Sequence, residues 1–262
     1  MNSNILMPYE KIFSCGIINF SGKCHNSTIK NHYLCIIITK LSNNILNMKH
    51  LDNIFAEKLL KISAIKLQPN NPFTWASGWN SPIYTDNRKT LSYPDVRSFI
   101  KVELCRLIEE NFGDAEVIAG VATGAIAQGA LVADTLGLPY IYIRSSPKDH
   151  GLENLIEGNL KPGQKVVIVE DLVSTGGSSL KAAQAVRNAG GEVIGMVAIF
   201  TYEFPVSVKA FKDAGVKLLT ISNYSAMIAA AKEIGYIAES DLATLEQWRK
   251  DPANWVPRKI EG

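Results

Sequence analysis

Two carboxylates and a glycine-containing turn follow one short apolar run in the second half of the chain. The apolar run covers residues 166–169, and the segment after it is Glu170, Asp171, Leu172, Val173, Ser174, Thr175, Gly176, Gly177 and Ser178. Adjacent carboxylates at a strand end can accept hydrogen bonds from vicinal hydroxyls, such as those of a ribose. A Ser/Thr/Gly turn that opens a helix exposes N–H groups to a phosphate, and its glycines permit close approach. The segment therefore predicts a ribose contact beside a phosphate cradle.

A long polar loop follows another apolar run, residues 140–143, and extends to about Gly163. It contains three cationic or protonatable residues: Arg144, Lys148 and His150. Loops of this length in a compact domain are either functional lids or disordered segments. The residues alone leave two readings open, convergence on an anionic leaving group or a solvated charge cluster.

The elements that must position these residues alternate between apolar runs and helical stretches. Near-continuous apolar strands alternating with helices indicate an α/β fold with a parallel sheet covered on both faces. Ligands bind such sheets at the carboxyl ends of the strands. The predicted strands are 117–121, 140–143, 166–169, 193–200 and 218–221, and helices that end before glycines are predicted at 125–136, 178–189 and 206–214.

Helical and turn-rich segments flank this alternation. Apolar residues at helical spacing predict a helix over residues 51–65, and Pro94 opens another that ends at about Asn111. Residues 73–84 are aromatic and rich in turns, which predicts a hairpin or an irregular hood. Two more helices are expected at about 225–234 and 240–250.

Residues 1–47 differ in composition from the rest of the chain. They are rich in Asn, Ile and Ser, with Glu10 as the one acidic residue, no Arg and no sustained period. Neither a secretory signal nor a transit peptide fits this composition. We expect Met48 to be the natural start and 1–47 to be a disordered or non-native extension. One domain is expected over 48–262, with a hood of about 48–95 plus the C-terminal helices and a core of about 96–222.

Charge and cysteine content exclude several classes. A formal net charge of +2 gives no indication of a nucleic-acid surface, and no apolar run approaches the roughly 20 residues of a membrane helix. The cysteine and histidine spacing in the N-terminal segment (Cys15, Cys24, His25, His32 and Cys35) fits no standard zinc pattern. Unpaired thiols indicate a reducing cytoplasm.

Together these segments resemble one enzyme family. A strand, two acids and a Ser/Thr-Gly turn resemble the phosphoribosyl pyrophosphate (PRPP) motif of type I phosphoribosyltransferases, whereas the Walker A and dinucleotide-binding patterns are absent. The order Arg144, Lys148, His150, Gly151 resembles the catalytic loop of orotate phosphoribosyltransferases. Residues 73–88 resemble the hood of the branch that carries F-T-W-A-S-G and D-N-R.

The resemblance implies Mg²⁺-dependent transfer of the phosphoribosyl group from PRPP to orotate in pyrimidine biosynthesis. It implies that Arg144, Lys148 and His150 approach the pyrophosphate, with Glu170 and Asp171 at the ribose. Residues 174–178 then hold the 5′-phosphate, Ser174 also touches orotate, and Mg²⁺ is held mainly through PRPP with Asp171 nearby. It further implies a homodimer in which the lid of one subunit covers the other subunit's site.

The hood supplies two further candidates for orotate. Within the resemblance, Tyr84 can stack on the pyrimidine and Arg88 can pair with the carboxylate by a bidentate contact. The alternatives are a packed tyrosine and a surface ion pair.

Three positions depart from the pattern of many family members. Ser145 and Ala76 stand where a lysine is common, and a Tyr-Lys pair is missing beside Thr123 and Gly124. Two other functions share the PRPP motif, a purine phosphoribosyltransferase and a PRPP-sensing regulator without catalysis. The hood argues against the purine enzyme, and the lid residues and near-neutral charge argue against the regulator.

Overall fold

The computed structural model describes residues 51–75, 77–146 and 155–257. The chain divides into two units, Met1–Met48 and Lys49–Gly262, and the described residues belong to the second unit. The predictions for residues 1–47, including the cysteines and histidines there, lie outside the described residues. Lys148, His150 and Ala76 lie outside them as well.

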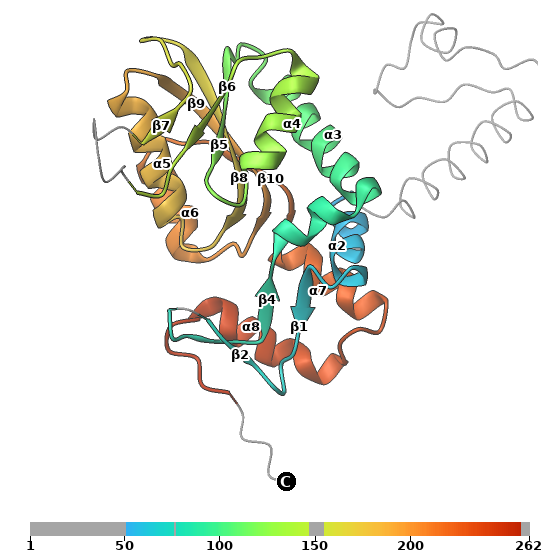
Figure 1. The fold of residues 1–262 in the computed structure, drawn as a ribbon. Helices are drawn as coiled ribbons and strands as arrows, with labels where there is room; N and C mark the ends of the chain where they lie inside the picture. The colour runs from blue at the N-terminus through green and yellow to red at the C-terminus, as the bar shows by residue number, and fades with distance from the viewer. Residues whose placement is uncertain (1–50, 76, 147–154, 258–262) are drawn as a thin grey trace, which may run out of the picture. The chain divides into compact units, whose positions relative to one another are not determined.

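A mixed six-stranded sheet organises the described unit (Figure 1). Its order is β10-β9-β8-β5-β6-β7, and every neighbouring pair is parallel except β6 with β7. The predicted parallel α/β sheet is confirmed, with one antiparallel edge strand added. The strands are β5 (Val117–Val121), β6 (Tyr140–Ile143), β7 (Ile156–Glu157), β8 (Lys165–Val173), β9 (Glu192–Thr201) and β10 (Leu218–Asn223).

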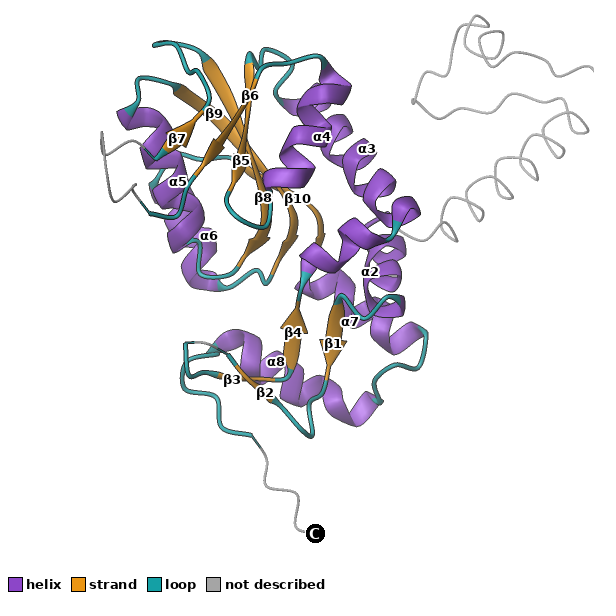
Figure 2. Ribbon diagram, in the orientation of Figure 1, coloured by secondary structure: helices purple, strands orange, loops and turns teal. Residues whose placement is uncertain are grey.

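Helices cover both faces of this sheet (Figure 2). The four helices α2, α3, α4 and α7 contribute to the core on one face, and α5 and α6 contribute to the core on the other. The helices of these layers are α2 (Leu51–Lys61), α3 (Pro94–Asn111), α4 (Ile126–Leu136), α5 (Gly177–Asn188), α6 (Pro205–Asp213) and α7 (Tyr224–Glu233). Among the described residues, no helix combines the length and apolarity needed to cross a membrane.

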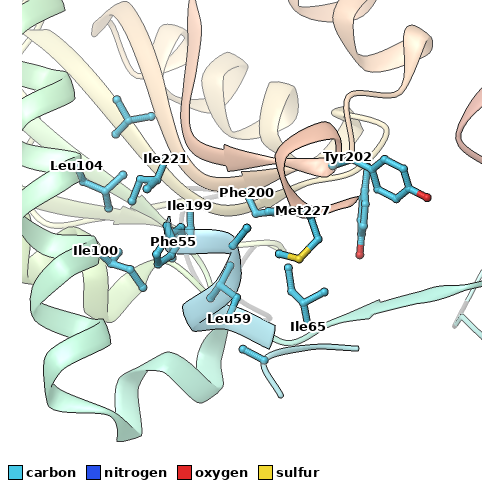
Figure 3. Packing of buried hydrophobic residues seen from close by; sticks show 14 of the residues in the cluster. Phe55, Leu59, Ile65, Ile100, Leu104, Ile199, Phe200, Tyr202, Ile221 and Met227 are labelled. Atoms are coloured by element: carbon cyan, nitrogen blue, oxygen red, sulfur yellow. The ribbon is translucent and has the colours of Figure 1, made fainter. Parts of the chain in front are cut away.

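Alternation along the strands sends side chains into two separate cores. Val167 and Val169 of β8 pack with α2, α3 and α7, whereas Val166 and Ile168 pack with α5 and α6. This period of two is what a strand covered on both faces requires. Figure 3 shows the first core, in which Phe55 of α2 and Met227 of α7 lie with residues of the sheet and α3.

The hood consists of two short antiparallel ladders. Strand β2 (Phe73–Thr74) pairs with β3 (Asn80–Ser81), which agrees with the hairpin predicted over residues 73–84. Strand β1 (Ile65–Leu67) pairs with β4 (Ile83–Thr85), a ladder that was not predicted. A 3₁₀ helix, η2 (Asn87–Ser92), leads from the hood into α3, and η3 (Glu239–Asp241) precedes α8 (Leu242–Lys250).

Most predicted boundaries shift by one or two residues, and three larger differences have identifiable causes. The first helix ends at Lys61, because Ser63 adopts a positive φ of 55° and Ile65 joins strand β1; the prediction that it reached residue 65 was wrong. Strand β8 continues through Glu170 and Asp171, since their backbone pairs with β9 although their side chains are polar. The loop after β6 contains β7, a strand too short to show a period.

Candidate active site

The junction between β8 and α5 forms the floor of a polar cavity of about 480 Å³. Its lining combines the acids and the turn predicted from sequence with residues from the hood and from the β5–α4 turn. The lining residues are Thr85, Asp86, Asn87, Arg88, Val121, Ala122, Thr123, Gly124, Glu170, Asp171, Leu172, Ser174, Thr175, Gly176 and Ser178. We call this the sugar-phosphate cavity.

The turn before α5 has the geometry of an anion cradle. Gly176 is the N-cap of the helix and has φ 84°, a left-handed conformation that favours glycine. The first backbone hydrogen bond of the helix runs from Leu180 N–H to the carbonyl oxygen of Gly176. The amides of residues 177–179 therefore have no helical carbonyl before them to bond, which leaves the helix N-terminus suited to an anion. Ser174, Thr175 and Ser178 line the cavity beside these amides.

The two adjacent acids have different environments. Glu170 is 4% exposed, and its two oxygens accept hydrogen bonds from Ser179 Oγ at 2.9 Å and from Asp171 N at 3.0 Å. Burial first, and then the neighbouring Asp171 carboxylate, raise the pKa of Glu170 to about 8. Asp171 is only half-buried and lines the cavity. Asp171 is therefore the acid more open to a ligand, and Glu170 braces the start of α5.

Close packing sets the position of Asp171. The side chain of Asn87 donates a 2.6 Å hydrogen bond to the backbone oxygen of Asp171, which ties η2 to β8. Gly124 lies against the carboxylate so closely that a Cβ at this position would overlap it. Asn87 was not predicted from sequence, because a contact across 84 residues leaves no local pattern.

A second cavity of about 510 Å³ adjoins the first. Val121, Ala122 and Ser178 line both cavities. Arg144, Ser145 and Lys181 line only the second, and Arg144 also pairs with Glu157 at 3.5 Å. Arg144 therefore lies near the turn after β5 and the start of α5, and Lys181 adds a cation that was not predicted from sequence. The predicted Lys148 and His150 lie outside the described residues.

A third, more apolar cavity of about 270 Å³ lies between the hood and the end of β8. It shares Thr85, Leu172 and Ser174 with the sugar-phosphate cavity. The rest of its lining is aromatic or from the hood strand: Thr74, Trp75, Tyr84 and Tyr202. We call this the aromatic cavity.

The other residues predicted to bind PRPP or orotate differ in their surroundings. Tyr84 lines the aromatic cavity and lies 5.5 Å from the Phe73 ring, centroid to centroid. Arg88 lines the sugar-phosphate cavity and pairs with Asp86 at 3.0 Å, which raises the pKa of its guanidinium. Val173 is fully buried in the core, and Gly177 lines the second cavity.

Similarity to known proteins identifies the family. A model of the phosphoribosyl transferase domain matches residues 102–227. The orotate phosphoribosyltransferase of Bacteroides fragilis is 69% identical over 212 residues, which are 81% of this chain and 100% of that protein. The chain belongs to the orotate phosphoribosyltransferase family. The family member from Bacteroides thetaiotaomicron is 68% identical over 208 residues, or 79% of this chain and 98% of that protein.

A solved orotate phosphoribosyltransferase has the same fold. The crystal structure of the enzyme from Aeropyrum pernix aligns with a TM-score of 0.62 at 25% identity, covering 70% of this chain and 99% of that one. The resemblance inferred from the strand-end acids, the loop and the hood is thereby confirmed at the level of family and fold.

Proposed function

We propose that this chain catalyses Mg²⁺-dependent transfer of the 5-phosphoribosyl group from PRPP to orotate, yielding orotidine 5′-phosphate and pyrophosphate in the cytoplasm. The observation that best supports this proposal is that two neighbouring cavities share Thr85, Leu172 and Ser174 in their linings. One is polar and opens on a helix N-terminus, and the other is walled by aromatic rings. A phosphorylated sugar and a flat ring can therefore lie side by side.

The sugar end of the proposal rests on the β8–α5 junction. The 5′-phosphate is bound by the turn from Ser174 to Ser178 through backbone amides and hydroxyls. The half-buried Asp171 carboxylate accepts hydrogen bonds from ribose hydroxyls. Glu170 supports this arrangement through Ser179, because both of its oxygens already accept hydrogen bonds within the protein.

The pyrophosphate end rests on cations around the backbone turn after β5. Arg144 and Lys181 line one cavity with Ala122 and Ser178, and we place Lys148 and His150 of the following loop with them. Charge that develops on departing pyrophosphate is best stabilised by donors already in place, and in many enzymes such stabilisation contributes most of the rate enhancement. Lys181 supplies positive charge on the side where Ser145 carries none.

The residues present fit a magnesium ion held mainly by its substrate. The described residues contain no cluster of three or more His, Cys, Asp or Glu placed to bind a metal. Asp171 nevertheless offers a hard carboxylate at the cavity wall, and Mg²⁺ commonly binds through one or two carboxylates and phosphate oxygens. When bound, the ion would neutralise charge on the pyrophosphate.

Orotate then occupies the aromatic cavity in this proposal. Tyr84 and Trp75 provide apolar ring surface, and Ser174 lies where the two cavities meet. Arg88 reaches the site from the sugar-phosphate cavity and is proposed to pair with the orotate carboxylate. We further propose a homodimer in which the loop from one subunit closes the partner's site.

The test is a spectrophotometric assay of orotate consumption with PRPP and Mg²⁺, repeated with adenine, hypoxanthine and uracil. The proposal expects consumption of orotate alone, with stoichiometric release of pyrophosphate. Turnover of a purine without orotate would replace it with the purine reaction. Binding of PRPP without turnover of any base would replace it with a sensing role.

A further inference from the structure

Thr85 occupies a position that neither its sequence context nor the PRPP motif singled out. It ends strand β4 and lines both the sugar-phosphate cavity and the aromatic cavity. A phenol from a distant part of the sequence reaches it, since Tyr202 Oη donates a hydrogen bond to Thr85 Oγ1 at 2.9 Å. The two residues are 117 positions apart.

Tyr202 is fixed in place by packing. It is 2% exposed, and its ring is held on several sides by other aromatic rings. Those contacts are Trp75 at 5.2 Å, Phe204 at 5.4 Å, Phe200 at 5.6 Å and Trp248 at 5.8 Å between centroids. Its backbone N–H donates to Val173 O at 3.1 Å. The phenol therefore has little freedom to turn away from Thr85.

The cluster around Tyr202 is itself anchored to the hood. Trp248 of α8 is fully buried, and its Nε1 donates to Asn80 O at 3.1 Å. Trp75 donates from Nε1 to Ile83 O at 3.0 Å. Indole donors thus tie the rings to both hood ladders, and the distance between Tyr202 and Thr85 is set by the fold.

Burial also fixes the chemical state of the phenol. It raises the pKa of Tyr202 well above its usual value, so the group remains a protonated donor at neutral pH. A hydroxyl has one proton to donate and two lone pairs to accept with. Because Tyr202 occupies a lone pair of Thr85 Oγ1, the proton of Thr85 is directed elsewhere. Within the described part of the chain, no protein acceptor takes that proton.

We propose that Thr85 donates a hydrogen bond to a ring carbonyl oxygen of the pyrimidine substrate, and that Tyr202 is the positioning residue that orients it. This inference rests on the proposed function and deepens it by naming a determinant of base specificity. A carbonyl oxygen complements the fixed donor. An exocyclic amino group at the same place would set one donor against another and leave both unpaired, which is the strongest ground for rejecting an analogue.

The test uses Thr85→Val, which keeps the branched shape and removes the hydroxyl. We expect kcat/KM for orotate to fall about 10-fold to 100-fold, the loss typical when a substrate hydrogen bond disappears in a desolvated site. KM for PRPP should change less than about 2-fold. Thr85→Ser retains the hydroxyl and should remain within about 5-fold of the wild type.

Tyr202→Phe tests the positioning role. It should lower kcat/KM for orotate about 3-fold to 10-fold, because the Thr85 hydroxyl is then no longer oriented. In the double variant, activity should fall no further than in Thr85→Val alone, since Tyr202 acts through Thr85. Multiplicative losses would mean that Tyr202 is only structural and would overturn its role.

Tyr224→Phe is the matched control. Tyr224 is also buried, its ring also packs on Trp248, and its phenol donates to Leu245 O at 3.0 Å in the C-terminal helix. Its removal should cost similar thermal stability and leave kcat/KM for orotate unchanged. A fall in kcat/KM equal to that of Tyr202→Phe would show that any lost phenol in the cluster disturbs the cavity, which would contradict the inference.

A substrate-side measurement keeps the inference testable if a variant fails to fold. Orotate analogues in which sulfur replaces one ring carbonyl oxygen present a poorer acceptor. Orotate has two ring carbonyl oxygens, so there are two such analogues. The wild type should turn over one of them about 10-fold more slowly than the other. Equal turnover of both analogues and of orotate would overturn the inference. The failure of the proposed function is separate, since wild-type protein would then not consume orotate at all.

Discussion

The buried carboxylate of Glu170 makes the stability of this fold depend on pH. Burial and the neighbouring Asp171 raise its pKa from 4.5 to about 8, so the folded state holds the proton more tightly than the unfolded chain. The stability contributed by the protonated group is fully present below pH 4.5 and is lost as pH rises through about 8. At ~1.4 kcal/mol per pH unit, the loss between pH 5 and pH 8 is on the order of 4 kcal/mol.

Glu170→Gln removes this titration and keeps the hydrogen bonds. The amide oxygen can accept from Asp171 N, and the amide nitrogen can donate to Ser179 Oγ, the two groups that Glu170 contacts at 3.0 and 2.9 Å. In the variant, position 170 no longer titrates, so it should contribute no pH dependence to the free energy of unfolding. The advantage of the variant over the wild type should therefore grow with pH.

Urea unfolding followed by tryptophan fluorescence at pH 5, 6, 7 and 8 measures the effect, because the chain contains four tryptophans. Glu109→Gln is the control, since Glu109 is an exposed carboxylate on α3. Its free energy of unfolding should follow the wild type at every pH. Parallel curves for wild type and Glu170→Gln would show that Glu170 ionises normally and would refute the reasoning from its burial.

Three further predictions concern turnover and ligand binding. Lys148→Ala should lower kcat by roughly 10² or more if its charge stabilises departing pyrophosphate; stopped-flow measurement of the chemical step checks this, and an unchanged kcat would reduce the loop to a cover. Lys181→Ala should raise KM for PRPP and the inhibition constant of pyrophosphate about 10-fold, with exposed Lys209→Ala as control; unaltered pyrophosphate inhibition would remove it from the site. Gly124→Ala should displace the Asp171 carboxylate and weaken PRPP binding at least 10-fold by calorimetry, since a Cβ would overlap it; wild-type affinity would mean that Asp171 does not set the ribose position.

Periodic apolar patterns explain why much of the fold was predictable. The strands at Val117–Val121 and Tyr140–Ile143 agree with prediction at both ends, and so does helix α3 (Pro94–Asn111), which proline opens. The local sequence predicts such elements, because apolar runs mark buried strands and residues such as proline mark the start of a helix. Strand β7 was not predictable because two residues carry no period.

The same division holds in the site. The acids and the glycine turn adjoin in sequence, so their chemistry could be inferred before their geometry. Asn87 and Tyr202 reach the cavities only through long-range packing, which no local pattern records. Lys181 instead lies three residues after Ser178 on α5, at a spacing that brings both side chains to one face of a helix, so this cation could have been inferred from sequence. The different environments of Glu170 and Asp171 also required the structure, because two adjacent acids look equivalent in sequence.

The central claim is that the β8–α5 junction binds a phosphorylated sugar beside the aromatic cavity. A crystal structure with PRPP, Mg²⁺ and orotate tests it most directly. We predict the 5′-phosphate within hydrogen-bonding distance of the amides of residues 175–178, a ribose hydroxyl at Asp171, and the pyrimidine between Tyr84 and Thr85. A sugar phosphate bound elsewhere, with this junction empty, would contradict the account.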